Sequence, residues 1–298
     1  NAFRMPGHVP VLLPAVLESL HLETTHRLID ATLGGGGHTI AMLDRMPPDG
    51  QVLGIEADPR TLESTKRRLS SVTNRVTVAA GNFRHLSKIA AAHGWESSDV
   101  VLLDLGVSSM TLDDPERGFS FRFDGPLDMR FDPTTQDITA ADLVNGWTHQ
   151  QLADCLYGLG EEHLSRQIAG AIIDARKKTP FTRTSQLAEV VASVKKVRGK
   201  THPATQTFQA LRLAVNDELG AILEVLPQLL TVLRPGGQAA IITFHSLEDR
   251  LVKRFIQAET KKGTIEPLTK KAIQPTRQEQ LDNPRSRSAK LRIFQTHS

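Results

Sequence analysis

The feature that most constrains the fold is an apolar stretch that runs directly into a turn of four glycines. Residues 28–33 have the composition of a short buried strand, and glycine occupies positions 34–37. A helical stretch follows at 38–46, and a second apolar strand is expected at 52–55. Glycines at a strand-to-helix turn let the backbone approach a ligand closely, and ligands of such sheets bind at the carboxyl ends of the strands. The turn therefore predicts a binding site at that edge.

Strands and helices continue to alternate up to residue 105. Helices are expected at 59–69 and 86–92, and strands at 76–80 and 100–105. The continuous apolar character of 100–105 is typical of a strand that is buried on both faces of a parallel sheet. The alternation predicts an α/β protein with a Rossmann-type sheet.

This alternation breaks after residue 105 and resumes near residue 216. Several helical stretches but no strand are expected in between, at 150–159, 164–177 and 184–195. The resumed pattern predicts, in order, a helix to 233, a turn at 235–237, a strand at 239–244, a helix at 246–258 capped by Ser246, an irregular segment at 263–284 and a last edge strand at 290–295. We therefore predict a sheet domain, residues 1–112 and 214–298, interrupted by a helical substrate-recognition subdomain, residues 113–213.

A carboxylate at the end of the second strand indicates a nucleoside ligand. Glu56 follows the glycine turn at the distance where an acidic side chain accepts the hydroxyl groups of a ribose. A dinucleotide fits poorly, because Thr39 stands where the G-x-G-x-x-G pattern needs its third glycine. Asp30, just before the glycines, suits the cationic sulfonium and ammonium groups of S-adenosyl-L-methionine better than a pyrophosphate. The sequence therefore favours S-adenosyl-L-methionine as the cofactor.

The distribution of charge indicates an anionic partner. The net charge is only +3, but residues 250–298 hold twelve Lys and Arg against four Asp and Glu. A basic region on a mildly acidic body is typical of proteins that bind nucleic acid, and a solvated lysine-rich surface has the same composition. The single cysteine, Cys155, excludes disulfide scaffolds and cysteine-based zinc sites within one chain, and no metal is expected. No apolar run reaches the length of a membrane helix, so we expect a cytoplasmic protein.

Motifs along nearly the whole chain resemble those of one methyltransferase family. The matching stretches are 8–12, 30–39, 104–109, 112–120, 124–130, 207–212, 215–219, 244–250 and 283–288. They occur in order, and several are long and unusual. On these motifs the chain resembles the S-adenosylmethionine-dependent ribosomal RNA small subunit methyltransferase H family, also called MraW.

The resemblance implies an activity and a set of site residues. Members of this family methylate the exocyclic N4 amine of a cytidine in the decoding region of small-subunit ribosomal RNA. The implied cofactor contacts are Gly36, Gly37, His38, Glu56, Phe83, Asp104 and Thr111. Two of them depart from the family pattern: Glu56 stands where aspartate is usual, and Thr111 stands where glutamine or histidine is common.

Asp104, at the end of the fourth expected strand, is the candidate catalytic residue. The N4 amine of cytosine is a poor nucleophile, because its lone pair is delocalised into the ring. An enzyme must therefore align the nitrogen with the methyl group and accept a proton. Asp104 is expected either to act on this nitrogen or to hold the amino end of the cofactor. Phe83 is similarly expected either to lie against the adenine or to fill the core.

Two groups of basic residues are candidates for RNA binding. One consists of Lys195, Lys196, Arg198 and Lys200 in the expected insertion, and the other of Arg285, Arg287, Lys290 and Arg292 near the C-terminus. Within each group no acidic residue separates the members, and a phosphate backbone would supply the counter-charge. A second interpretation is that these side chains only cap helices and keep the surface soluble.

The expected partner is small-subunit ribosomal RNA within the assembled small subunit, and a homodimer is a further expectation. The segment 108–130 is expected to be either a loop that closes over the substrate or a structural connector. His245 is expected either to touch the substrate or to make a structural hydrogen bond. Two other functions fit parts of the pattern. A dinucleotide-dependent oxidoreductase conflicts with the glycine spacing, and a non-catalytic RNA-binding factor conflicts with the intact glycine turn, Glu56 and Asp104.

Overall fold

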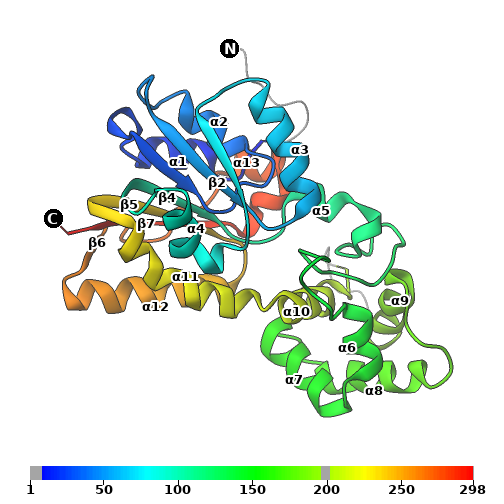
Figure 1. Ribbon diagram of the computed structural model, residues 1–298. Coiled ribbons are helices and arrows are strands. Elements are labelled where there is room, and N and C mark those ends of the chain that lie inside the picture. The colour runs from blue at the N-terminus through cyan, green and yellow to red at the C-terminus, as the bar shows by residue number, and fades with distance from the viewer. Residues whose placement is uncertain (1–8, 196–201, 298) are drawn as a thin grey trace. The chain divides into compact units, whose positions relative to one another are not determined.

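The computed structural model describes residues 9–195 and 202–297 of the 298-residue chain. The chain forms two compact units (Figure 1). The first comprises Asn1–Gly106 together with Leu219–Ser298, and the second comprises Val107–Glu218. The boundaries expected from the sequence, 113 and 213, lie inside the second unit. No helix in the described part of the chain is long and apolar enough to cross a membrane.

The first unit is built on a seven-stranded sheet (Figure 1). The strands are β1 (Arg27–Asp30), β2 (Gln51–Glu56), β3 (Val76–Ala80), β4 (Ser98–Asp104), β5 (Leu233–Thr243), β6 (Ile265–Pro267) and β7 (Lys290–Thr296). Their spatial order is β3-β2-β1-β4-β5-β7-β6. The strands from β3 to β5 are parallel, and β7 is antiparallel to both of its neighbours. The dinucleotide-binding order 3-2-1-4-5-6 lacks this antiparallel strand.

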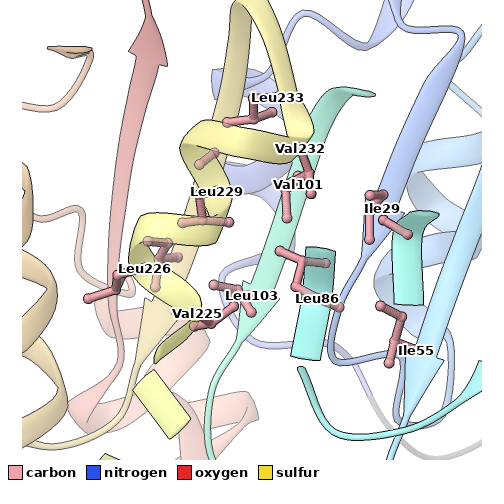
Figure 2. Packing of buried hydrophobic residues seen from close by; sticks show 14 of the residues in the cluster. Ile29, Ile55, Leu86, Val101, Leu103, Val225, Leu226, Leu229, Val232 and Leu233 are labelled. Carbon is pink, nitrogen blue, oxygen red and sulfur yellow. The ribbon is translucent and has the colours of Figure 1, made fainter. Parts of the chain in front are cut away.

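Both faces of the sheet are buried, because successive side chains of a strand point to opposite faces. In β4, Val101 and Leu103 belong to one apolar cluster, and Val100 and Leu102 belong to another. Figure 2 shows the first cluster, in which Leu229 packs together with the β4 residues. This double burial explains why the strand sequences are continuously apolar rather than alternating.

Helices cover the two faces of the sheet, and most of them lie close to where the sequence predicts them; the first and the last, at 13–19 and 277–282, were not expected. They are α1 (Leu13–Ser19), α2 (Gly37–Leu43), α3 (Pro59–Ser70), α4 (Leu86–Ala92), α11 (Glu218–Val232), α12 (Ser246–Lys262) and α13 (Arg277–Asp282). The start of α3 shows why the prediction succeeds. The Asp58 side chain accepts the N–H of Arg60 at 3.0 Å, and Pro59 takes the first helical position, where its missing N–H costs nothing.

The structure corrects three expectations for the C-terminal region. Residues 290–296 form β7, but β7 is not an edge strand, because β6 adds a further strand outside it. The segment expected to be irregular, 263–284, contains both β6 and α13. The N-cap of α12 is His245 rather than Ser246, and its side chain accepts the N–H of Glu248.

Strand β5 begins earlier than expected. Ser98 pairs with Leu233 and Val100 pairs with Gln238, so the register shifts between these two pairs. The expected turn residues lie in this irregularity, where Gly236 has a φ of 75°. The turn conformation is therefore present, but it forms a bulge within the strand instead of preceding it.

The second unit is helical and has its own apolar core. Its helices are α5 (Ser109–Asp113), α6 (Ala140–Gly146), α7 (His149–Gly160), α8 (Ser165–Arg176), α9 (Thr184–Val194) and α10 (Thr205–Asn216). The sequence predicts α7, α8 and α9 to within one or two residues at each end, whereas α6 and α10 were not expected. Leu152 and Leu156 of α7, Ile168 of α8 and Leu211 of α10 are fully buried in this core.

The segment 108–130 is packed tightly within this unit. The guanidinium of buried Arg117 donates to the carbonyl groups of Arg130 and Phe131, at 2.9 and 3.0 Å. A Cβ atom on Gly118 would lie 2.1 Å from the carbonyl oxygen of Pro126, closer than any contact allows. These contacts support the interpretation of this segment as a structural connector.

Candidate active site

The glycine turn between β1 and α2 requires glycine for conformational reasons. Gly34 and Gly36 have φ angles of 49° and 71°, in the left-handed region that side chains with a Cβ rarely adopt. Gly36 is the N-cap of α2, and Gly37 is its first residue. Thr65 Oγ1 of α3 donates to the carbonyl of Gly34 at 2.7 Å, which fastens the turn to the neighbouring helix. The N-terminus of α2 therefore opens directly onto the carboxyl edge of the sheet.

Glu56 connects the end of β2 to this turn. Its Oε2 accepts the N–H of Gly34 and its Oε1 accepts the N–H of Asp58, both at 2.8 Å. Desolvation by burial raises the pKa of the Glu56 carboxyl to about 7, against the lowering effect of these backbone hydrogen bonds. A carboxylate can accept more hydrogen bonds than these two, so the side chain keeps acceptor capacity for a ligand hydroxyl group.

Asp30 occupies a different environment from the one expected beside a cationic ligand. It is almost completely buried, and its Oδ2 accepts the hydroxyl of Thr39 at 2.6 Å. Its Oδ1 accepts the N–H of Thr32 at 3.3 Å. Burial raises the pKa of Asp30, and the hydrogen bond from Thr39 opposes that shift. The carboxyl group therefore joins the end of β1 to the first turn of α2, instead of facing a ligand.

His38 and Asp104 each have buried side-chain atoms at this edge that lack a hydrogen-bond partner in the described part of the chain. His38 is only 6% exposed, and in the described structure neither of its ring nitrogens has a hydrogen-bond partner. Its Nε2 lies 3.5 Å from Asp104 Oδ2, and Asp104 Oδ1 is buried without a partner. Buried polar atoms normally find partners, and those that lack them mark a ligand or a functional role.

The main chain fixes Asp104 at the end of β4. Its N–H donates to Thr32 Oγ1 at 2.6 Å, and the following N–H, of Leu105, bonds to the carbonyl of Ile242 in β5. Gly106 then turns the chain with a φ of 101°, and a Cβ atom on it would lie 3.3 Å from the ring of Phe244. The carboxylate is thus anchored through its backbone while its side chain remains available.

Local sequence signals missed the threonines that organise this site. Thr32 supports the backbone of Asp104, and Thr39 holds Asp30. Thr65 lies on another helix and still reaches the glycine turn. Only Thr32 and Thr39 are near a recognisable motif, so the contact made by Thr65 depends on how α3 packs.

The other two expected cofactor contacts lie in different settings. Phe83 begins a short 3-10 helix (Phe83–His85) after β3 and packs, partly buried, against the core of the first unit. Thr111 belongs to the second unit, where its hydroxyl lies 2.9 Å from that of Ser108 at the start of α5. The partial exposure of Phe83 is compatible with either of its two expected roles.

The residues of the first unit fit S-adenosylmethionine. The unpartnered atoms of His38 and Asp104 lie at the carboxyl edge of the sheet, where ligands of such sheets bind. Glu56 lies at the end of the adjacent strand β2, at the position of a ribose acceptor. The left-handed glycines leave the backbone between these groups free of side chains.

The structure shows that some members of the two basic groups are paired with carboxylates. Lys195 forms an ion pair with Glu162, which is only 2% exposed, so its charge is already balanced. Lys290 and Arg292 both pair with Asp249 of α12, at 3.1 and 2.7 Å. The sequence near these three residues offers no balancing carboxylate, as expected, but the fold brings distant carboxylates to them, so their charges are paired.

The remaining members of the two groups stay candidates. Lys196, Arg198 and Lys200 lie outside the described residues. Arg285 and Arg287 belong to a 3-10 helix (Pro284–Ser288), in which the side chain of Arg287 is exposed.

The contacts of His245 support a structural hydrogen bond rather than contact with the substrate. Its Nδ1 caps α12 by accepting the N–H of Glu248, and its Nε2 lies 3.1 Å from Oε1 of the same residue. The carboxylate of Glu248 also accepts the N–H of Phe244 at 2.8 Å. Nδ1 therefore serves the junction between β5 and α12, whereas Nε2 is buried without a hydrogen-bond partner in the described structure.

Three features together define a methyltransferase of Rossmann type. They are a sheet with an antiparallel seventh strand, a glycine turn after β1, and carboxylates at the ends of β2 and β4. Within this class the chain belongs to the MraW methylase family, whose family model matches residues 5–297. The family and the fold expected from the sequence are confirmed.

Relatives of similar length support this assignment. Proteins called Ribosomal RNA small subunit methyltransferase H from Thermomicrobium roseum and Carboxydothermus hydrogenoformans are each 44% identical to this chain. Both alignments cover 96% of this chain, and they cover 92% and 96% of the two relatives. Among solved structures, a candidate rRNA-methylase from Clostridium thermocellum matches with a TM-score of 0.50 at 10% identity, over 97% of this chain and 99% of that one. That likeness concerns the fold alone.

Proposed function

We propose that the protein transfers a methyl group from S-adenosyl-L-methionine to small-subunit ribosomal RNA, at the exocyclic N4 amine of a cytidine. The observation that carries the proposal is the pair of orphaned polar groups, His38 and Asp104, beside the glycine turn. The names of relatives that are 42–44% identical along nearly the full chain support the RNA substrate. The choice of the N4 amine rests on the family resemblance of the motifs.

Three parts of this chain would hold the cofactor. Glu56 accepts the two ribose hydroxyl groups while it keeps its bonds to the N–H groups of Gly34 and Asp58. The bare backbone at Gly36 lets the cofactor approach the N-terminus of α2. His38 takes a polar contact at the amino-acid end. When bound, S-adenosylmethionine supplies an electrophilic methyl group on a sulfonium centre.

Asp104 is the group that acts on the nucleophile. Its Oδ1, buried and without a partner, accepts a hydrogen bond from the cytosine amine and orients the nitrogen lone pair toward the methyl group. The same oxygen then receives the proton that the amine loses. Oδ2 lies 3.5 Å from His38 Nε2, so the imidazole helps to hold the carboxylate in place at the end of β4. Most of the rate enhancement comes from positioning.

The second unit is the proposed substrate-recognition subdomain, because it has its own core and can present a surface of fixed shape to RNA. The target cytidine must leave its stack to reach the sheet edge, and recognition of the surrounding RNA compensates for the energy of unstacking. The assembled small subunit is the proposed substrate. In that particle the folded RNA offers many phosphates to the protein at once.

The test is direct. Purified protein is incubated with S-adenosylmethionine labelled in its methyl group and, in parallel, with small subunits or naked small-subunit RNA. Mass spectrometry of the digested RNA then identifies the modified nucleoside and its position. We expect N4-methylcytidine at a single position in subunits. A label on another atom would refute the assigned chemistry, and a label on naked RNA alone would refute the assembled substrate.

A further inference from the structure

A surface pocket of about 320 Å³ lies between α12 and the segment around β6, in the first unit. Three lysines line it: Lys253 and Lys261 on α12, and Lys270 just beyond β6. All three are exposed, and no ion pair in the described part of the chain involves any of them. The pocket therefore concentrates positive charge that the fold does not balance.

Two other basic residues in the same region are paired with carboxylates. Arg292 also lines the pocket, but it is held by Asp249. Lys262, next to Lys261, is paired with Glu259 at 2.6 Å. Carboxylates are thus present in this region, and no ion pair in the described part of the chain joins one of them to a pocket lysine.

The helix places its pocket residues on one face. Lys253, Ile256, Gln257, Thr260 and Lys261 follow the spacing i, i+3, i+4, i+7, i+8, so they form a single stripe along α12. At a rise of about 1.5 Å per residue, the two lysines at its ends are about 12 Å apart along the helix axis.

The rest of the lining suits a phosphate backbone rather than a protein partner. Gln257 and Thr269 offer neutral hydrogen-bond donors between the lysines, whereas the hydroxyl of Thr260 donates to the carbonyl of Ile256 at 2.7 Å. Ile256 supplies an apolar contact, but it is 8% exposed and offers little apolar surface to a partner. Contacts of polar and basic side chains with phosphate oxygens make up most of a typical protein–nucleic acid interface.

We infer that the α12–β6 pocket, defined by Lys253, Lys261 and Lys270, docks the phosphate backbone of the RNA substrate away from the reacting cytidine. This inference rests on the proposed function and extends it. The pocket lies beside β6 and β7, whereas the cofactor residues lie on β1, β2, β4 and α2. The contact therefore adds affinity without taking part in the chemistry.

The test replaces all three lysines with glutamine, which removes the charge and keeps most of the side chain. The matched control makes the same charge change on other surfaces of the first unit, with Arg45, Lys66 and Lys88 each replaced by glutamine; all three are exposed. Binding to naked small-subunit RNA and to small subunits is measured from 50 to 300 mM salt. Cofactor binding and thermal unfolding are measured for every variant.

Binding constants for RNA fall as salt rises, so a plot of log K against log salt has a negative slope. Losing three phosphate contacts should make this slope shallower by about 2, and the binding constant at 0.1 M salt should fall by at least about tenfold. Cofactor affinity and melting temperature should match the wild type, and the control triple should change the slope by less than half as much. An equal change in the control would refute a specific site. Weaker binding to subunits with unchanged binding to naked RNA would also refute it, since a ribosomal protein would then be the partner.

A different result would show that the proposed function is wrong. The wild-type protein would then leave small subunits unmethylated. The salt dependence of its RNA binding, compared between wild type and triple variant, would still decide whether the pocket docks RNA.

Discussion

The imidazole of His38 and the carboxylate of Asp104 face one another at the carboxyl edge of the sheet, with Nε2 3.5 Å from Oδ2. His38 comes from the first turn of α2 and Asp104 from the end of β4, so the two residues are adjacent only in the folded sheet. Neither ring nitrogen of His38 has a hydrogen-bond partner in the described structure, and Asp104 Oδ1 is also without one. The pair is therefore the part of the site most ready to bind a polar ligand.

Replacing Asp104 with alanine should abolish methyl transfer more completely than it weakens cofactor binding. The carboxylate is proposed to orient the amine and take its proton, and a general base typically contributes about 10²- to 10⁴-fold to the rate. Turnover at saturating cofactor should therefore fall below a tenth of the wild-type value. Calorimetry with S-adenosylhomocysteine separates the two roles, because affinity that falls as far as the rate would make Asp104 a binding residue only.

Replacing Glu56 with alanine should weaken cofactor binding by at least about tenfold. Hydrogen bonds to a charged group are worth about 1.5–3 kcal/mol, and two ribose hydroxyl groups would lose their acceptor. The N–H of Gly34 would also lose its partner, so the turn itself should loosen. An unchanged dissociation constant in calorimetry would show that the ribose lies elsewhere.

Cofactor affinity should rise with pH around neutrality. Burial raises the pKa of Glu56 to about 7, so the free protein holds a proton there at lower pH. The ionised carboxylate is the better acceptor for ribose hydroxyl groups, and binding must therefore release that proton. Affinity should increase by about tenfold between pH 6 and pH 8 and then level off.

Calorimetry in buffers of different ionisation enthalpy measures the released proton. The Glu56→Gln variant is the control, because it keeps any titration of the cofactor's own amine and removes that of the carboxyl. A pH dependence of the same size in this variant would contradict the assignment to Glu56.

Replacing Gly118 with alanine should destabilise the second unit by at least about 3 kcal/mol. Its φ of 71° is unfavourable for alanine, and the added Cβ would lie 2.1 Å from a backbone oxygen. Gly158 is the matched control, since a Cβ there, on the exposed face of α7, meets nothing within 4 Å. Gly158→Ala should stabilise the protein by about 0.5–1 kcal/mol. Urea unfolding followed by circular dichroism compares the two, and equal effects would show that the connector is not tightly packed.

Replacing Lys195 with alanine should affect stability rather than RNA binding. Its ammonium group balances the buried carboxylate of Glu162, and removing one partner of a buried ion pair costs about 3 kcal/mol or more. The exposed pair of Lys177 and Asp174 is the comparison, where Lys177→Ala should cost less than about 1 kcal/mol. If this variant kept a normal melting temperature and its RNA binding depended less on salt, Lys195 would instead be an RNA contact.

The sequence by itself determined the order of the elements and the chemistry of the cofactor edge. Continuous apolar runs mark β1 and β4 because both of their faces are buried, and this information is contained in each short segment. The glycine turn and Glu56 were recognisable for the same reason, since each lies at a fixed position relative to its own strand. The motifs together were enough to identify the family.

Only the tertiary structure decided which charges remain free. In the sequence Lys290, Arg292 and Lys195 appear unbalanced, yet Asp249 and Glu162 lie far along the chain and meet them only after folding. The position of β7 inside the sheet was hidden in the same way, because a strand of three residues, β6, carries almost no local signal. Electrostatic pairing and strand order depend on contacts between distant segments, and a local pattern holds no record of them.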